Sequence, residues 1–308
     1  MNVASIDIGT NTVILLIAKI NISDKSITTI LNEYQMPRLG KGLLDGQPLP
    51  EENIARLYRV FDIYSGIISK HDCSLVIANG TSALRRASNS DVVIKEIRDK
   101  YGIEINVISG EEEARLSYLG AVTAADNSQY TVIDIGGGST EIISGFMDRI
   151  EFKKSFHAGV VSLTERFIGH NPPLPEETAA LEFEIRKIFA GLGSLKKEGL
   201  LVSLAGTPTT LACIKAGLKE YDEEIIEGSR LSRSELRSFV DLLSSLSTRE
   251  ITEKFGAVTE GRSDLILCGA AILFQLMDIM DAEETLVSAK GLRYGAVTDF
   301  ISKSYRDL

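Results

Sequence analysis

The feature that most constrains this chain is a short motif that occurs twice. Residues 3–12 read V-A-S-I-D-I-G-T-N-T, and residues 132–140 read V-I-D-I-G-G-G-S-T. Each copy is an apolar, strand-like segment that ends in Asp-Ile-Gly, followed by a tight turn of small residues and a second β-branched segment. The two copies stand about one domain length apart. The repeat therefore predicts two duplicated domains that face each other across a cleft.

The residue types in these turns suit phosphate and a divalent cation. Glycine lets the backbone approach a phosphate closely and direct several N–H groups at it. The aspartates at the strand ends, Asp7 and Asp134, can hold a divalent cation directly or through water. A strand follows each turn and the turns lack a lysine, which excludes a P-loop and the dinucleotide fingerprint. A plain hairpin stays open as the alternative, more strongly for Gly9 than for residues 136–138.

Strand-like and helix-like segments are mixed along the whole chain, which predicts an α/β fold. The polar break at residues 125–128 is the best boundary, and it predicts domains of residues 1–124 and 125–291. We expect the C-terminal helix within residues 292–308 to pack back on the first domain. The expected strands cover residues 3–8, 12–17, 26–34, 75–78, 103–108, 129–135, 139–145, 200–204 and 285–288. The expected helices cover residues 51–69, 92–101, 111–125, 160–169, 176–197, 208–220, 232–246, 248–256, 262–280 and 292–304.

Composition and charge narrow the class of partner. Apolar residues make up 44% and charged residues 25%, the balance of a soluble globular protein. The formal net charge of -10 provides no global field to attract nucleic acid or an anionic membrane. The three cysteines are far apart in sequence, so neither a disulfide framework nor a Cys-based zinc site is indicated. With no secretory signal and no apolar run of about 20 residues, we expect a cytoplasmic protein.

The joint order of several motifs resembles that of the exopolyphosphatase/guanosine-pentaphosphate phosphatase family, a branch of the superfamily that contains actin, sugar kinases and the heat-shock ATPases. The resemblance runs along nearly the whole chain, and the order and spacing of the motifs are highly specific. Besides the N-terminal turn, the matching segments are R-L-G at 38–40, T-S-A-L-R-R-A at 81–87, I-S-G-E-E-E-A-R-L at 108–116, D-I-G-G-G-S-T-E at 134–141, G-V-V-S-L-T-E at 159–165, A-G-T-P-T-T-L-A at 205–212 and S-A-K-G-L-R-Y-G at 288–295.

This resemblance implies two actin-like (ribonuclease H-like) domains that flank a cleft. It also implies Mg²⁺-dependent hydrolysis of the terminal phosphoanhydride of inorganic polyphosphate, with release of orthophosphate. Guanosine pentaphosphate 5′-phosphatase activity stays open as the alternative. An acceptor kinase of the same superfamily, a non-catalytic nucleotide-binding or filament protein of the actin type, and a homodimer also stay open.

The resemblance further implies roles for individual residues. Glu113 is the expected general base, Asp134 and Glu141 are the expected metal ligands, and Arg85 is the expected substrate arginine. The other expected contacts to substrate or phosphate are Asp7, Thr10, Asn11, Arg38, Gly136, Gly137, Gly138, Ser139, Thr140, Gly206 and Thr207.

Local chemistry supports some of these roles and leaves others open. Glu113 stands in the first turn of an expected helix with a capping box of Ser109 and Glu112. There a carboxylate complements the helix dipole, and it also stays ionised and able to direct a water molecule. Arg85 and its neighbour Arg86 lie on different sides of a helix, so at most one should face the site.

Two further expectations concern the second half of the chain. Thr207 and Pro208 are typical of an N-cap and a first helical residue, a turn that faces an anion or only starts a helix. Longer members of the family carry extra C-terminal helical domains that lengthen the polyphosphate channel, whereas this chain stops at Leu308. Together with the net charge of -10, this predicts that few phosphates are held at once and that long chains are cleaved distributively.

Overall fold

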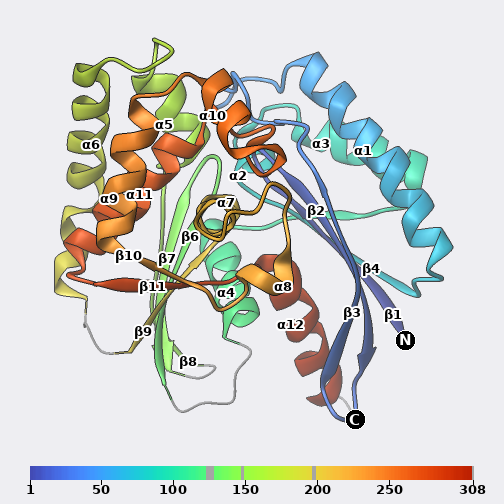
Figure 1. Cartoon of the computed structure of the whole chain (residues 1–308). Helices are drawn as coiled ribbons and strands as arrows, with labels where there is room; N and C mark the ends of the chain where they lie inside the picture. The colour runs from blue at the N-terminus through green and yellow to red at the C-terminus, as the bar shows by residue number, and fades with distance from the viewer. Residues whose placement is uncertain (123–127, 147–148, 196–198, 307–308) are drawn as a thin grey trace. The chain divides into compact units, whose positions relative to one another are not determined.

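The computed structural model describes residues 1–122, 128–146, 149–195 and 199–306. It divides into two compact units, the first formed by Met1–Thr123 with Lys290–Leu308 and the second by Ala124–Ala289. Each unit is an α/β structure around one mixed sheet (Figure 1). Among the residues described, no helix is long and apolar enough to cross a membrane.

The first unit contains a five-stranded sheet with the order β3-β2-β1-β4-β5. Strands β1, β2 and β3 are antiparallel neighbours, whereas β4 and β5 run parallel to β1. Its strands are β1 (Asn2–Ile8), β2 (Val13–Asn21), β3 (Ser26–Gln35), β4 (Leu75–Gly80) and β5 (Ile105–Val107). Its helices are α1 (Glu51–Lys70), α2 (Ser82–Arg86), α3 (Ser90–Tyr101), α4 (Gly110–Ala121) and α12 (Leu292–Arg306).

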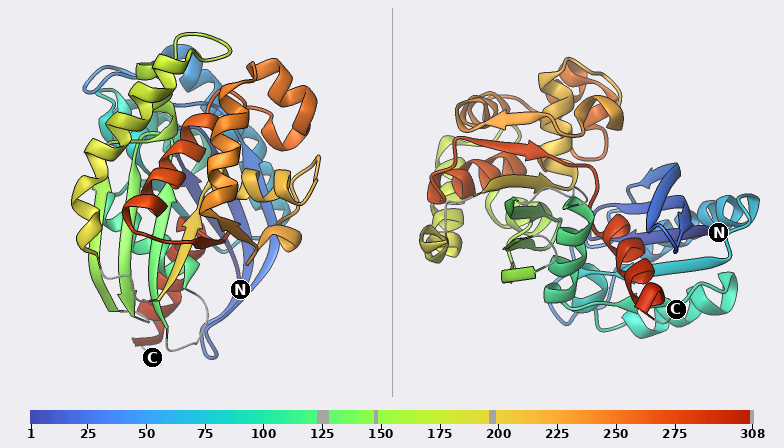
Figure 2. Two further views of the ribbon diagram at one scale, coloured as in Figure 1. Left: turned by 60° about the vertical axis from the view of Figure 1, so that its left-hand side comes forward. Right: turned by 90° about the horizontal axis from the view of Figure 1, so that it is seen from below.

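Alternation along β1 assigns its side chains to two different helical layers. Ala4, Ile6 and Ile8 share a core with residues of α1 and α3. Val3 lies on the opposite face, in a cluster with residues of the C-terminal helix α12, which also packs on α4 (Figure 2). Because successive side chains of a strand point to opposite faces, Asp7 belongs to the α12 face of the sheet.

The second unit repeats this topology. Its six-stranded sheet has the order β10-β11-β9-β6-β7-β8. The antiparallel trio β6-β7-β8 and the parallel neighbours β9 and β11 correspond to β1-β2-β3, β4 and β5, and β10 is an added edge strand. Its strands are β6 (Gln129–Ile135), β7 (Thr140–Phe146), β8 (Arg149–Phe156), β9 (Leu200–Leu204), β10 (Arg230–Ser232) and β11 (Glu284–Val287).

Helix α11 (Ile266–Ile279) is the centre of this unit's helical layer. It is apolar around most of its circumference and almost entirely buried, as expected for a helix covered on all sides. The other helices are α5 (Val160–Phe167), α6 (Pro175–Phe189), α7 (Gly206–Lys215), α8 (Glu223–Ile226), α9 (Arg233–Ser244) and α10 (Thr248–Phe255), with short 3₁₀ turns at Ala190–Ser194 and Ala257–Thr259.

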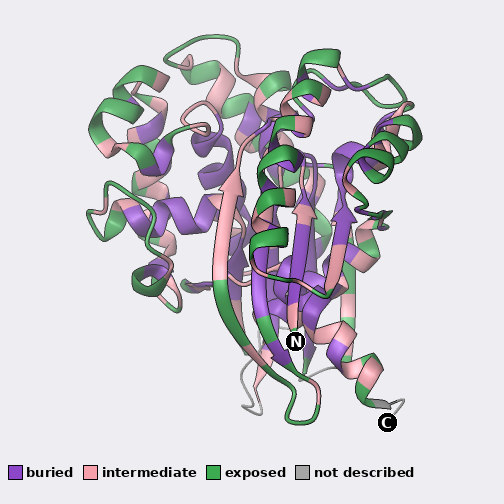
Figure 3. Ribbon diagram, turned by 90° about the vertical axis from the view of Figure 1, so that its right-hand side faces the viewer, coloured by how far each residue is buried: buried purple, intermediate pink, exposed green. Residues whose placement is uncertain are grey.

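Several elements differ from the expectations. Helix α4 ends at Ala121 instead of residue 125, and residues 123–127 lie outside the described residues. Helix α6 ends at Phe189 and continues as a 3₁₀ turn that contains Gly191 and Gly193, residues that disfavour an α-helix interior. Strand β8 is absent from the expected elements, although its apolar residues alternate as in a half-buried strand. Figure 3 shows how burial concentrates on the strands and on the helix sides that cover them.

Candidate active site

The two glycine turns have the same backbone geometry. In the first unit the N–H of Gly9 donates to the carbonyl of Thr12 at 3.0 Å, and in the second the N–H of Gly136 donates to the carbonyl of Ser139 at 2.9 Å. Each turn joins two antiparallel strands, so the repeated sequence corresponds to a repeated hairpin. Both turns are therefore hairpins in their backbone structure. Whether a turn also binds a ligand depends on the residues that surround it.

The carboxylates beside the turns differ between the units. Asp134 on β6 lies directly opposite Glu141 on β7, whereas its counterpart Asp7 lies opposite the apolar Ile14. Directly opposite residues of antiparallel strands project from the same face, with Cβ atoms about 5 Å apart. Only the turn of the second unit thus has two carboxylates side by side.

Glu141 is buried and has a hydroxyl donor beside it. Its side chain is fully buried, and Ser155, directly opposite on β8, donates its hydroxyl to Oε1 at 2.6 Å. Carboxylate oxygens are the ligands that Mg²⁺ prefers, usually one or two together with water. No group of three or more His, Cys, Asp and Glu side chains is placed to hold a metal within the described part of the chain. The pair of Asp134 and Glu141 fits magnesium by the chemistry of its donors.

The turn of the second unit is held by the start of α5. The N–H of Val161 donates to the carbonyl of Gly137 at 2.8 Å. Gly159 lies so close that a Cβ atom there would be 2.4 Å from the Gly137 carbonyl carbon. Thr140 is fully buried, and its hydroxyl donates to the carbonyl of Ala158 at 2.5 Å. The proton of this hydroxyl supports the turn, so Thr140 is poorly suited to donate to phosphate.

The turn of the first unit is supported by the R-L-G segment. Gly40 donates its N–H to the carbonyl of Thr10 at 2.8 Å, and Arg38 donates its N–H to the carbonyl of Asn11 at 3.0 Å. Arg38 adopts a left-handed backbone with φ of 53°, a conformation that costs energy for a side chain of this kind. In the described structure the side-chain oxygen of Asn11 is buried without a hydrogen-bond partner, and such atoms are rare in folded proteins.

Glu113 and Arg85 form an ion pair. Arg85, at the end of α2, donates Nη1 to Glu113 Oε2 at 2.8 Å and to the carbonyl of Ile108 at 2.9 Å. Glu113 is 9% exposed and lies in the first turn of α4, where the helix dipole favours a negative charge. Arg86 instead binds Asp45. The adjacent arginines therefore point to different partners, as expected from their positions on a helix.

The three consecutive glutamates of α4 have separate surroundings. Ser109 is the N-cap, and its hydroxyl accepts the N–H of Glu112 at 3.1 Å. The expected capping box is wrong in its second half, because the carboxylate of Glu112 binds Arg115 one turn later. The hydrogen bonds from Arg115 lower the pKa of Glu112. Glu111 is exposed and Glu112 is partly exposed, so Glu113 is the buried one of the three glutamates.

The start of α7 differs from the expectation. The helix begins at Gly206 and its N-cap is Ala205, so Thr207 is not the N-cap. Ala205 adopts φ of 73° and ψ of -168°, a region occupied almost only by glycine. Arg262 donates Nη1 to the carbonyl of Gly206 at 2.9 Å. Thr207 is buried, and Gly269 of α11 lies against its hydroxyl.

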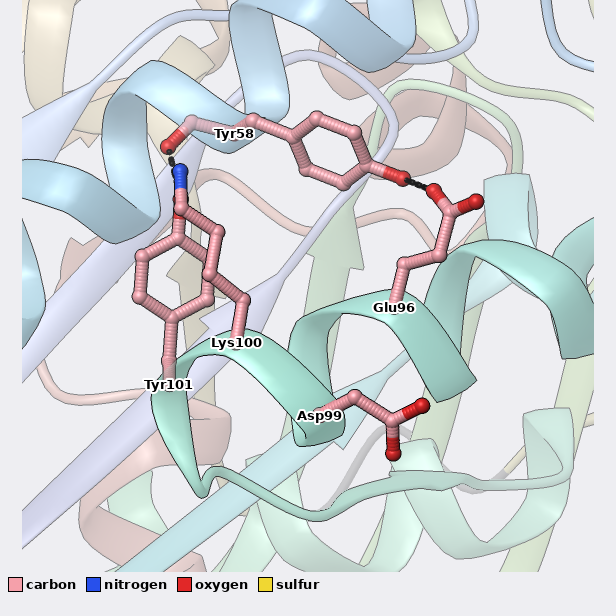
Figure 4. A pocket seen from close by; sticks show the side chains of 5 residues that line it. All are labelled: Tyr58, Glu96, Asp99, Lys100 and Tyr101. Carbon is pink, nitrogen blue, oxygen red and sulfur yellow. Dashed lines mark hydrogen bonds between the residues drawn. The ribbon is translucent and has the colours of Figure 1, made fainter.

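The described residues also form an open pocket of about 420 Å³ between α1 and α3. Figure 4 shows its lining side chains, among them Tyr58, whose hydroxyl binds Glu96, and Tyr101, whose hydroxyl binds the carbonyl of Tyr58. None of the candidate site residues lines this pocket. We therefore assign it no role in the reaction.

Comparison with known proteins identifies the family. The profile of the Ppx/GppA phosphatase family matches residues 16–304. The chain belongs to this family. The crystal structure of the Aquifex aeolicus family member is 30% identical, with a TM-score of 0.83 over 99% of this chain and 98% of that one. This match confirms the expected α/β fold.

Individual relatives share the catalytic class but differ in substrate and length. The chain is 32% identical to exopolyphosphatase 2 of Mycobacterium tuberculosis, over 89% of each protein. It is also 32% identical to a bifunctional 3-dehydroquinate synthase/phosphatase of Fusobacterium nucleatum, over 96% of this chain and 46% of that protein. A guanosine-5′-triphosphate,3′-diphosphate pyrophosphatase of Photobacterium profundum is 27% identical, over 97% of this chain and 59% of that protein. The chain thus spans about half the length of two of these relatives. Family membership makes it a phosphoanhydride hydrolase, as expected.

Proposed function

We propose that this protein hydrolyses the terminal phosphoanhydride of inorganic polyphosphate and releases orthophosphate by attack of water. Family membership and the similarity to an exopolyphosphatase support this substrate class. The observation that carries the proposal is the ion pair of Glu113 and Arg85. It places a buried carboxylate beside a guanidinium group, and guanidinium groups commonly bind phosphate.

Glu113 would act as the general base. The neighbouring Arg85 cation favours its ionised form, and a carboxylate has about four acceptor positions. Glu113 can therefore accept a proton from the attacking water while it keeps the bond from Arg85. The water oxygen bonds to the terminal phosphorus, and the bond from this phosphorus to the bridging oxygen breaks. The bridging oxygen leaves with the shortened chain, and the terminal phosphorus is released as orthophosphate.

The glycine turns would bind and orient the phosphates. Backbone N–H groups in such turns donate to phosphate oxygens without the entropy cost of long side chains. Asp134 and Glu141 would hold Mg²⁺, which when bound neutralises negative charge on the phosphates. Positioning and charge neutralisation supply most of the catalysis in phosphoryl transfer, so these residues should matter as much as the base.

Guanosine pentaphosphate is the second candidate substrate, because a relative that covers 97% of this chain is named for that chemistry. Water would be the acceptor in both reactions, and Glu113 would have the same role. Initial rates of orthophosphate release from tripolyphosphate, long polyphosphate and guanosine pentaphosphate, measured in parallel, would rank them. Transfer to an added acceptor without release of orthophosphate would instead indicate a kinase.

The mechanism is tested by Glu113→Gln. We expect the variant to remain folded and its kcat to fall by roughly 10²–10⁴, the usual effect of losing a general base. Glu111→Gln is the matched control, since Glu111 is an exposed carboxylate of the same helical turn. A Glu113→Gln kcat within about threefold of wild type would show that the base lies elsewhere.

A further inference from the structure

Arg293 is a buried arginine for which the proposed reaction has no use. It belongs to the S-A-K-G-L-R-Y-G segment, lies in the first turn of α12, and is 3% exposed. A guanidinium removed from water is costly unless its donors are satisfied by well-placed partners. Its partners therefore indicate what this cation does.

Two hydrogen-bond partners of Arg293, Asn32 and Tyr34, lie on β3. Its Nε donates to Oδ1 of Asn32 at 3.0 Å, and its Nη2 donates to the hydroxyl of Tyr34 at 2.9 Å. The guanidinium also lies 5.5 Å from the centre of the Tyr34 ring and 4.9 Å from the centre of the Tyr294 ring. The Tyr294 hydroxyl in turn accepts from Asn32 Nδ2 at 3.0 Å. Helix α12 thus holds the second half of β3 through a connected polar network.

Strand β3 is followed along the chain by the Arg38–Gly40 segment, which supports the N-terminal glycine turn. It is an edge strand with β2 as its neighbour, and edge strands have fewer restraints than central ones. Only a few residues after Tyr34, Arg38 and Gly40 donate their N–H groups to Asn11 and Thr10. The position of the Tyr34 end of β3 therefore affects the segment that supports the turn.

The sheet register strengthens this connection. Tyr34 lies opposite Ile14, and Ile14 lies opposite Asp7. These three residues form one row across the sheet, on the face that α12 covers. The network of Arg293 thus ends in the same row as Asp7, immediately before the turn of residues 9–12.

We propose that Arg293 is a positioning residue for the N-terminal phosphate-binding turn. By holding Asn32 and Tyr34, it keeps the Arg38–Gly40 segment against Thr10 and Asn11 in the conformation that binds phosphate. This inference rests on the proposed function, in which that turn binds substrate. Glu113 pairs with Arg85, whereas Asn32 and Tyr34 are bonded to Arg293, so loss of Arg293 should weaken substrate binding more than it slows the chemical step.

The test compares Arg293→Met with Lys303→Met. Methionine keeps most of the length of arginine and removes its charge and donors. Lys303 is a 69% exposed cation of the same helix that pairs with Asp299, so its replacement controls for loss of a positive charge from α12. We expect Arg293→Met to raise KM for tripolyphosphate at least tenfold with kcat within about threefold of wild type, and Lys303→Met to change neither.

A milder variant protects the test against misfolding. Tyr34→Phe removes the hydroxyl acceptor of Arg293 and keeps the ring, so it should raise KM in the same direction by a smaller factor. Circular dichroism melts establish that each variant is folded at the assay temperature. If Arg293→Met does not fold, the KM of Tyr34→Phe tests the proposal instead. A wild-type KM in that variant would overturn the proposal.

The outcomes separate this inference from the proposed function. Calorimetry measures tripolyphosphate binding to Glu113→Gln with and without Arg293→Met, so binding is observed without turnover. At least tenfold weaker binding in the double variant supports the positioning role whatever the turnover results show. Unchanged binding, or a Tm loss with wild-type KM and kcat, overturns it and leaves the proposed function intact. A wild-type protein that releases no orthophosphate from any of the substrates contradicts only the proposed function.

Discussion

Replacing Gly295 by alanine tests how closely the C-terminal helix must approach the helix that carries Glu113. A Cβ atom at Gly295 of α12 would lie 1.8 Å from the carbonyl oxygen of Leu116 on α4 and 3.0 Å from the N of Gly120. The obstacle is backbone, which cannot rotate away as a side chain would. The two helices would have to separate by about 1.2 Å before the shorter contact reached the 3.0 Å lower limit of observed Cβ contacts.

The expected change in stability has two opposing parts. Overpacking of this kind costs about 3 kcal/mol, the upper end of the usual range, because the obstacle is rigid. Alanine is favoured over glycine in a helix interior by about 1 kcal/mol. The net expectation for Gly295→Ala is a loss of about 2 kcal/mol in the free energy of unfolding, or roughly 4–8 °C in Tm.

Gly66→Ala is the matched control. Gly66 lies within α1, and a Cβ atom there meets no atom within 4 Å. That variant should gain about 0.5–1 kcal/mol from helix propensity alone. The two glycine-to-alanine variants should therefore differ by about 3 kcal/mol in urea unfolding, although the chemical change is the same.

The same variants also test the link to activity. Glu113 precedes Leu116 by three residues on α4, so a displacement of this helix by about 1 Å should move the carboxylate and lower kcat by up to about 10². Gly66→Ala should keep wild-type kcat. If Gly295→Ala proved as stable and as active as Gly66→Ala, the close helix contact would not be what positions Glu113, and the reasoning would be refuted.

Two further predictions concern carboxylates of the second unit. Asp134→Asn and Glu141→Gln should each raise the Mg²⁺ concentration needed for half-maximal activity, and an unchanged metal titration in both would show that the metal is held elsewhere. The hydrogen bond with His170, followed by those from two backbone N–H groups, lowers the pKa of Glu177 from 4.5 to about 2. Its contribution to stability is present above pH 4.5 and is lost as the pH falls toward 2. Glu177→Gln should thus be less stable than wild type in urea unfolding at pH 7, and a gap that did not shrink at pH 3 would contradict this assignment.

The agreement between sequence and structure was best where neighbouring residues act on one another. The glycine turns are closed by hydrogen bonds between residues three apart, from Gly9 to Thr12 and from Gly136 to Ser139. The first turn of α4 is likewise capped by Ser109. The prediction from neighbouring residues was wrong at the start of α7, where the N-cap is Ala205 in a conformation typical of glycine. Alanine does not favour that conformation by itself, so the packing around the turn must stabilise it.

The sequence alone therefore determined the two duplicated turns, the α/β class and the family, because short-range patterns and their order specify them. Only the tertiary structure decided which side chains meet. Arg85 reaches Glu113 across 28 positions, and Arg293 reaches Asn32 across 261. The sheet register placed Glu141 between Asp134 and Ser155. Such contacts depend on loop closure and on the packing of distant layers, and local sequence patterns carry little information about either.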